Sequence, residues 1–158
     1  MERRRRAKLF KSYPINKKYR TTNHMAVTSG SAKRIVDDVL SIYDVVLGIS
    51  IMNMKGNILA ANSKEAFREV FRVTQDRATD SGALALATLN VVNETRNIFG
   101  RVEAIITIHQ NCKLMLLPLP PFQLLVGLVL ERSVNVEDKI AKEIEKLVAD
   151  TLAKHSRL

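Results

Sequence analysis

Cysteine is almost absent from this sequence: Cys112 is the single one among 158 residues. One cysteine excludes a disulfide framework within the chain and a metal site built from several cysteines. Because no base lies near Cys112 in the sequence, an ordinary thiol is favoured over a nucleophile, even with Lys113 beside it. Low cysteine content is typical of reducing compartments, so we expect a cytoplasmic protein.

The short motifs that accompany phosphate binding and covalent catalysis are missing as well. The sequence contains no Gly-x-Gly-x-x-Gly, no Gly-Lys-Ser/Thr phosphate loop and no Gly-x-Ser-x-Gly elbow. The three histidines, His24, His109 and His155, are far apart, and His109 is predicted to face solvent at a strand end. We therefore expect no catalytic residues, no metal site and no cofactor, and predict that the chain is not an enzyme.

Long uninterrupted apolar segments are also lacking. The longest apolar stretch, Leu114–Leu130, is broken by Pro118, Pro120, Pro121 and Gln123. Proline would leave backbone groups unpaired in lipid, so we interpret this stretch as two strands and a turn. We predict no membrane span, and the N-terminus has no apolar segment of the signal-peptide type.

Positive charge is concentrated at the N-terminus. The net charge is +9, but residues 1–34 carry +10 and residues 35–158 carry −1. Like charges repel and no hydrophobic period is sustained there, so residues 1–30 are predicted to form a disordered tail. Its basic cluster consists of Arg3, Arg4, Arg5, Arg6, Lys17, Lys18 and Arg20.

Several interpretations of this tail stay open. It is a solvated arm without function, a contact for nucleic acid or for an anionic membrane surface, or an organelle-targeting segment. A further alternative is that Met25 is the true start, so that the tail is never made.

Hydrophobic periodicity after the tail predicts the element order α-β-β-α-β-β-β-α, in which the second α stands for a helical region in two parts. The expected helices are a first one capped by Ser29 or Ser31, a short one at Lys64–Val73, a long middle one from Asp80 or Ser81 to Phe99, and a closing one capped by Asn135. The expected strands are Val45–Met54, Asn57–Ala61, Arg101–His109, Lys113–Leu117 and Phe122–Glu131. Lys55 and Gly56 predict a tight hairpin turn, since glycine supplies a positive φ.

The middle helix carries almost no charge. Asp80 is the only charged residue between Ala78 and Asn93, whereas a helix facing water normally carries several. At about 100° per residue, one face holds Leu84, Ala87, Thr88, Val91, Thr95, Ile98 and Phe99, and we expect it to pack on the sheet. The opposite face holds Leu86, Leu89, Asn90, Asn93 and Asn97. Charge depletion is typical of an interface core, so these five residues are predicted to form a homodimer interface. The alternative is a helix buried by the rest of the chain.

This arrangement resembles the roadblock (dynein light chain) family of longin-like α/β domains. The matching residues are Leu47-Gly48-Ile49-Ser50-Ile51 leading to Lys55-Gly56-Asn57-Ile58-Leu59, and Leu114–Leu119 with Leu124–Leu130. The resemblance covers about residues 31–155, so we divide the chain into a tail (1–30) and a roadblock-like domain (31–158). The resemblance depends more on the order of the elements than on any single motif.

The resemblance implies an α+β fold: a five-stranded antiparallel sheet in the order 2-1-5-4-3 with helices on both faces. It also implies a homodimer formed by the middle helix and the third strand, and a small Ras-like GTPase as partner. Two features depart from the family. Pro118 would sit in an interior strand, so strand four is expected to end or bulge there. The basic tail has no counterpart.

Three function classes follow. The leading one is a dimeric scaffold or regulator, whose partner docks across the paired middle helices or at the sheet edge Asn57–Asn62. The second is a ligand sensor of the Per-Arnt-Sim type, which shares the strand order. A sensor needs an internal pocket with polar groups, whereas the expected core is almost wholly aliphatic. The third is a nucleic-acid binder acting through the tail alone.

Overall fold

A computed structural model describes residues 27–68, 78–135 and 137–155 of the chain. The predicted tail, with its basic cluster Arg3–Arg6, Lys17, Lys18 and Arg20, lies outside the described residues. The elements are α1 (Ser29–Ile42), β1 (Val46–Asn53), β2 (Ile58–Ser63), the 3-10 turn η3 (Glu65–Phe67), α3 (Ala78–Asn93), α4 (Arg96–Phe99), β3 (Ile105–Ile108), β4 (Cys112–Leu119), the 3-10 turn η4 (Pro120–Phe122), β5 (Leu124–Glu131) and α5 (Glu137–His155).

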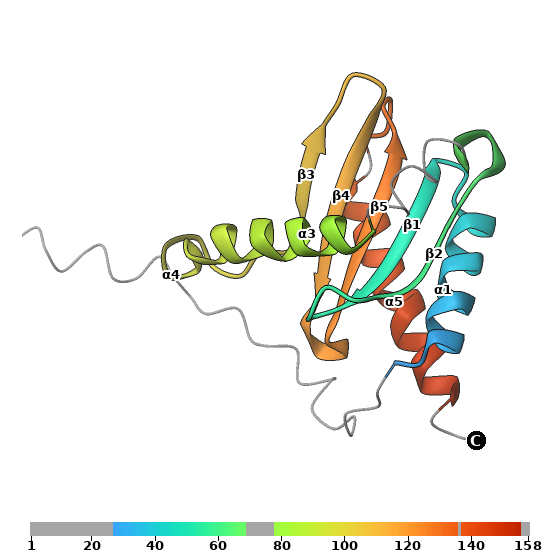
Figure 1. The fold of residues 1–158 in the computed structure, drawn as a ribbon, viewed down its shortest axis with the longest axis horizontal. Helices are drawn as coiled ribbons and strands as arrows, with labels where there is room; N and C mark the ends of the chain where they lie inside the picture. Colours follow the sequence, from blue (N-terminus) through green and yellow to red (C-terminus); the bar gives the residue numbers. More distant parts are fainter. Residues whose placement is uncertain (1–26, 69–77, 136, 156–158) are drawn as a thin grey trace, which may run out of the picture.

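The five strands form one antiparallel sheet in the order β2-β1-β5-β4-β3, which confirms the predicted fold class and strand order. Helices α1 and α5 cover one face of the sheet, and α3 crosses the other (Figure 1). Within the described sheet, β2 and β3 are therefore the two edge strands.

Helix α1 begins earlier than the predicted domain boundary at residue 31. Thr28 caps it, because its hydroxyl oxygen accepts a hydrogen bond from the Ser31 backbone N–H at 3.1 Å. The Ser31 hydroxyl in turn accepts one from the Thr28 N–H at 3.1 Å, which completes a capping box. Val27, just before the cap, packs against the core. The cap is thus Thr28, whereas the sequence predicted Ser29 or Ser31.

The β1–β2 hairpin is closed by a turn that contains Lys55 and Gly56. Gly56 has φ 84°, a left-handed conformation that glycine adopts without steric cost. The Asn53 side-chain oxygen accepts hydrogen bonds from the backbone N–H groups of Lys55 (2.9 Å) and Asn57 (3.0 Å). These bonds hold the turn and set the start of edge strand β2.

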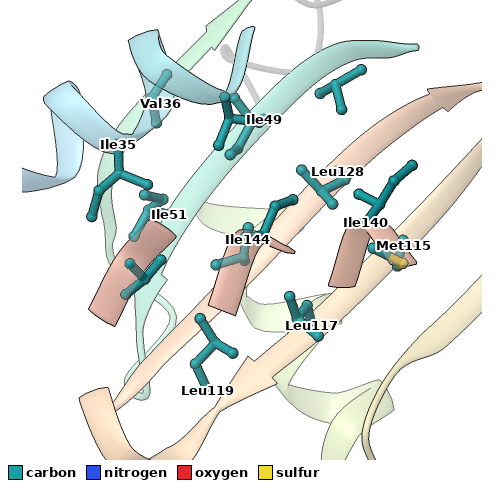
Figure 2. Packing of buried hydrophobic residues seen from close by; sticks show 14 of the residues in the cluster. Ile35, Val36, Ile49, Ile51, Met115, Leu117, Leu119, Leu128, Ile140 and Ile144 are labelled. Carbon is teal, nitrogen blue, oxygen red and sulfur yellow. The ribbon is translucent and has the colours of Figure 1, made fainter. Parts of the chain in front are cut away.

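The main hydrophobic core lies between the sheet and the two terminal helices (Figure 2). Ile35 and Val36 of α1 and Ile144 of α5 are buried against Ile49 and Leu128 of the central strands. The buried residues are aliphatic apart from Met115, as the sequence patterns predicted, and none of the described β3 residues belongs to this cluster. The sheet's third strand is therefore covered less than the other four on this face.

Strand β4 neither ends nor bulges at Pro118, contrary to the sequence prediction. It continues to Leu119 and stays in register with β5, with Pro118 opposite Leu125. Strand β3 pairs only with Lys113 to Leu116 of β4. Pro118 thus lies where β4 has a described neighbour on one side alone, and the lack of an N–H costs little in such an edge-like position.

The predicted middle helix is divided into two. Helix α3 ends at Asn93, and the short α4 follows, with its C-cap at Gly100 (φ 88°). The Thr95 hydroxyl donates to the Val92 carbonyl at 2.7 Å, which competes with continued helix at this point. Of the short helix predicted at Lys64–Val73, the described part holds the single turn η3, and residues 69–77 lie outside the described residues.

Candidate protein-interaction surface

Helix α3 packs on the sheet through the face that the sequence analysis placed outside. Leu89 is 3% exposed and forms a small cluster with Met52 and Leu125, against which Ala85 and Leu86 also pack. The prediction that Leu86 and Leu89 lie on the outer face is therefore wrong. These leucines stabilise the protomer itself.

The reason lies in the composition of α3. Apolar side chains occur all round this helix, so its apolar residues do not mark one side as the inner one. Neither side of its second half carries a charge that would have to face water. Only the position of the sheet decides which side is buried.

The end of α3 and the whole of α4 leave the sheet. Figure 1 shows them extending past the β3 edge, and every residue from Asn93 to Gly100 is exposed. Val91 is 66% exposed, Ile98 65% and Phe99 80%, although the sequence analysis assigned all three to the sheet-facing side. Such large apolar side chains in water are costly unless something covers them.

The neighbouring sheet edge is apolar as well. In β3, Ile106 is 40% exposed and Ile108 62%, and Leu114 of β4 is 40% exposed. Together with the helix residues they form what we call the α3–β3 surface, in which Val91, Ile98, Phe99 and Leu114 lie on the α3 side of the sheet and Ile106 and Ile108 on the α5 side. These are six of the eight exposed large hydrophobic residues in the described part of the chain, so exposure of this kind is concentrated here.

The two parts of this surface are complementary to each other. Thr107 lies opposite Leu114, next to the Ile105–Leu116 pair that packs under α3, so Leu114 faces the α3 side of the sheet. The end of α3 and α4 extend beyond the sheet, and Leu114 at the sheet edge is exposed. Both features lie on the α3 side of the sheet.

The polar members of the predicted interface stay exposed. Asn90, Asn93 and Asn97 all lie on the solvent side of α3 and α4. Asn90 and Asn97 directly precede Val91 and Ile98 of the α3–β3 surface in the sequence. Leu89 is buried and Leu86 half-buried against the sheet, so neither is an exposed apolar side chain on this helix.

The opposite sheet edge holds a hollow of about 350 Å³ between α1 and β2. It is lined by Ser29, Lys33, Val36, Asp37, Leu59, Ala60, Ala61 and Asn62, which includes most of the edge predicted as a docking site. Lys33 donates to the Asp37 carboxylate at 2.7 Å, and this hydrogen bond lowers the pKa of Asp37. The hollow lies at the surface and not within the aliphatic core.

His109 and Cys112 belong to no cluster of metal-ligating side chains in the part of the chain that the structure describes. Among residues 27–68, 78–135 and 137–155, no three His, Cys, Asp or Glu side chains gather as metal ligands. His109 lies at the surface with its Nε2 atom 3.0 Å from the Thr107 hydroxyl, and Cys112 is half-buried at the start of β4. Within the same ranges, no helix is long and apolar enough to cross a membrane.

Comparison with known proteins identifies the fold. No protein-family model and no curated protein matches the sequence. A roadblock/LC7 domain from Streptomyces avermitilis superposes with a TM-score of 0.59 at 11% identity, covering 78% of this chain and 97% of that one. The gliding protein MglB from Thermus thermophilus has a TM-score of 0.59 at 9% identity, with 85% and 99% covered. An MglB with a tetrameric arrangement has a TM-score of 0.55 at 9% identity, with 83% and 99% covered. The chain thus has the roadblock fold, as its element order predicted.

Proposed function

We propose that this protein is a non-enzymatic interaction module that forms a homodimer through its α3–β3 surface and presents the paired domain to other proteins. The observation that carries the proposal is the concentration of exposed apolar side chains where α3 and α4 extend past the β3 edge. Monomeric proteins rarely leave such a patch in water, whereas protein interfaces commonly contain one.

The dimer would use both kinds of contact that this surface offers. The β3 edges of the two copies would pair, since an edge strand has backbone groups free for a further strand. The strand sequence Ile105–Ile108 has no charge or proline that would discourage such pairing. Phe99 and Ile98 of each copy would then reach the α3 side of the other sheet, where Leu114 is exposed. The tetrameric arrangement of one structural neighbour supports self-association of this fold.

The protein partner is proposed from the roadblock resemblance to be a small Ras-like GTPase. Its docking site would be the paired α3 helices or the edge strand β2, beside the hollow between α1 and β2. The same resemblance and the aliphatic core favour this scaffold over a ligand sensor, which would need an enclosed polar pocket.

The oligomeric state can be tested with one charged substitution and a matched control. Phe99→Arg places a charge in the proposed contact, and Ile42→Arg places the same charge on α1, at an apolar residue that is also exposed (58%). We expect size-exclusion chromatography with light scattering to give twice the 17.8 kDa chain mass for the wild type and for Ile42→Arg. Phe99→Arg should give 17.8 kDa with an unchanged circular dichroism spectrum.

Two results would contradict the proposal. A wild-type mass of 17.8 kDa throughout the micromolar range would show that the chain does not self-associate. Equal dissociation by both substitutions would show that the contact is not located at the α3–β3 surface.

A further inference from the structure

Among the residues that the structure describes, no element covers strand β3 on the face opposite α3. Residues directly opposite each other in a strand pair point to the same face. Ile106 lies opposite Met115 and Ile108 opposite Lys113, and these two β4 residues face α5. Ile106 and Ile108 therefore lie on the α5 side of the sheet, where they are 40% and 62% exposed. Helix α5 covers β4 and does not extend over β3 in the described structure.

A buried ion pair holds α5 in this position. The Lys113 ammonium, on a residue that is 5% exposed, lies 2.5 Å from the Glu137 carboxylate in the first turn of α5. It also donates to the Val134 carbonyl. The first turn of α5 is thus anchored over the start of β4, one strand away from the exposed isoleucines.

The flank of α5 turned away from α1 carries two carboxylates, Asp138 and Glu145, and the exposed Lys142 lies between this flank and the solvent side. Burial and, after it, the neighbouring Glu143 carboxylate raise the pKa of Tyr43, which places Glu143 on the α1 side of α5. Ile144 is fully buried, so at about 100° per residue Glu145 projects from the flank away from α1. Asp138, two turns earlier, lies on the same flank and is exposed.

In the proposed dimer these features form a trough across the twofold axis. Its floor would be the two β3 strands with Ile106 and Ile108 from each copy, and its walls would be the two α5 helices. Two adjacent strands span about 10 Å, and an α-helix with its side chains is about 10–12 Å wide. We propose that the trough binds one amphipathic helix of a partner protein, with its apolar stripe on the isoleucines and basic side chains toward Asp138 and Glu145. This assignment rests on the proposed homodimer.

A basic amphipathic peptide of leucine and lysine, carrying a fluorophore, serves as the probe for a titration by fluorescence anisotropy. We expect one peptide to bind per two chains, because the trough exists once per dimer. Ile108→Thr keeps a β-branched residue in the strand but removes apolar floor from both copies, and should weaken binding about tenfold. The matched control Ile42→Thr, at an exposed isoleucine on α1, should bind like the wild type.

The outcomes separate this inference from the proposed function. If light scattering shows the full chain to be monomeric, the proposed dimer is wrong and the trough with it. If the chain is dimeric but binds no peptide, binds one per chain, or binds equally after Ile108→Thr, only the trough assignment is wrong. If binding appears only in a full-length variant with Arg3, Arg4, Arg5 and Arg6 changed to alanine, the chain's own tail occupies the trough and the partner assignment fails.

Discussion

Leu89 and Val91, two residues apart in α3, should respond in opposite ways to truncation. Leu89 is 3% exposed and packs with Met52 and Leu125, whereas Val91 is 66% exposed. Leu→Ala in a core costs about 2–5 kcal/mol. Because this cluster has only three buried members in the described structure, its neighbours can partly close the gap. We therefore expect Leu89→Ala to cost about 2–3 kcal/mol of protomer stability.

Val91→Ala should leave the protomer within about 0.5 kcal/mol of the wild type, as is usual for exposed sites. Its effect should instead depend on protein concentration, because Val91 belongs to the proposed dimer contact. Urea unfolding followed by circular dichroism at several protein concentrations measures both the protomer stability and its dependence on dimer formation. A cost below about 1 kcal/mol for Leu89→Ala, together with a concentration-dependent loss, would place Leu89 at the interface and refute the packing described above.

Three further predictions concern single contacts and ligands. The hydrogen bond from the Lys113 ammonium lowers the pKa of Glu137 from its ordinary value of 4.5. The pair therefore stabilises the fold above that ordinary value, and this stability is lost as the pH falls through the lowered pKa. In Glu137→Gln, the free energy of unfolding should depend less on pH in that range. A Cβ on Gly127 would meet the Ser50 hydroxyl oxygen at 2.8 Å, so Gly127→Ala should lower the stability measured by thermal unfolding by about 1–3 kcal/mol. Ser50→Ala should relieve this loss. The control Gly30→Ala meets nothing closer than 3.8 Å and should be tolerated. Calorimetry with GTP, GDP and ATP should show no heat of binding, since the sequence lacks a phosphate loop; micromolar affinity would contradict the scaffold proposal.

Local patterns in the sequence were sufficient for the five strands, the first and last helices and their order. Alternation in Val46–Asn53 and helical spacing in Glu137–His155 follow from backbone geometry, because strand side chains alternate between two faces and helix side chains repeat about every 3.6 residues. Gly56 marked a turn because its positive φ is costly for other residues. Element order, through its resemblance to roadblock domains, then predicted the sheet order.

The tertiary structure decided three features that depend on which segments become neighbours. The buried face of α3 is the one holding Leu89, since apolar residues surround this helix and only contact with Met52 and Leu125 distinguishes its sides. Pro118 is accommodated inside β4 because β3 is too short to pair with it. Lys113 is buried because Glu137 lies beside it, 24 residues further along the chain. In each case the outcome depends on whether segments distant in sequence come into contact, and no local periodicity contains that information.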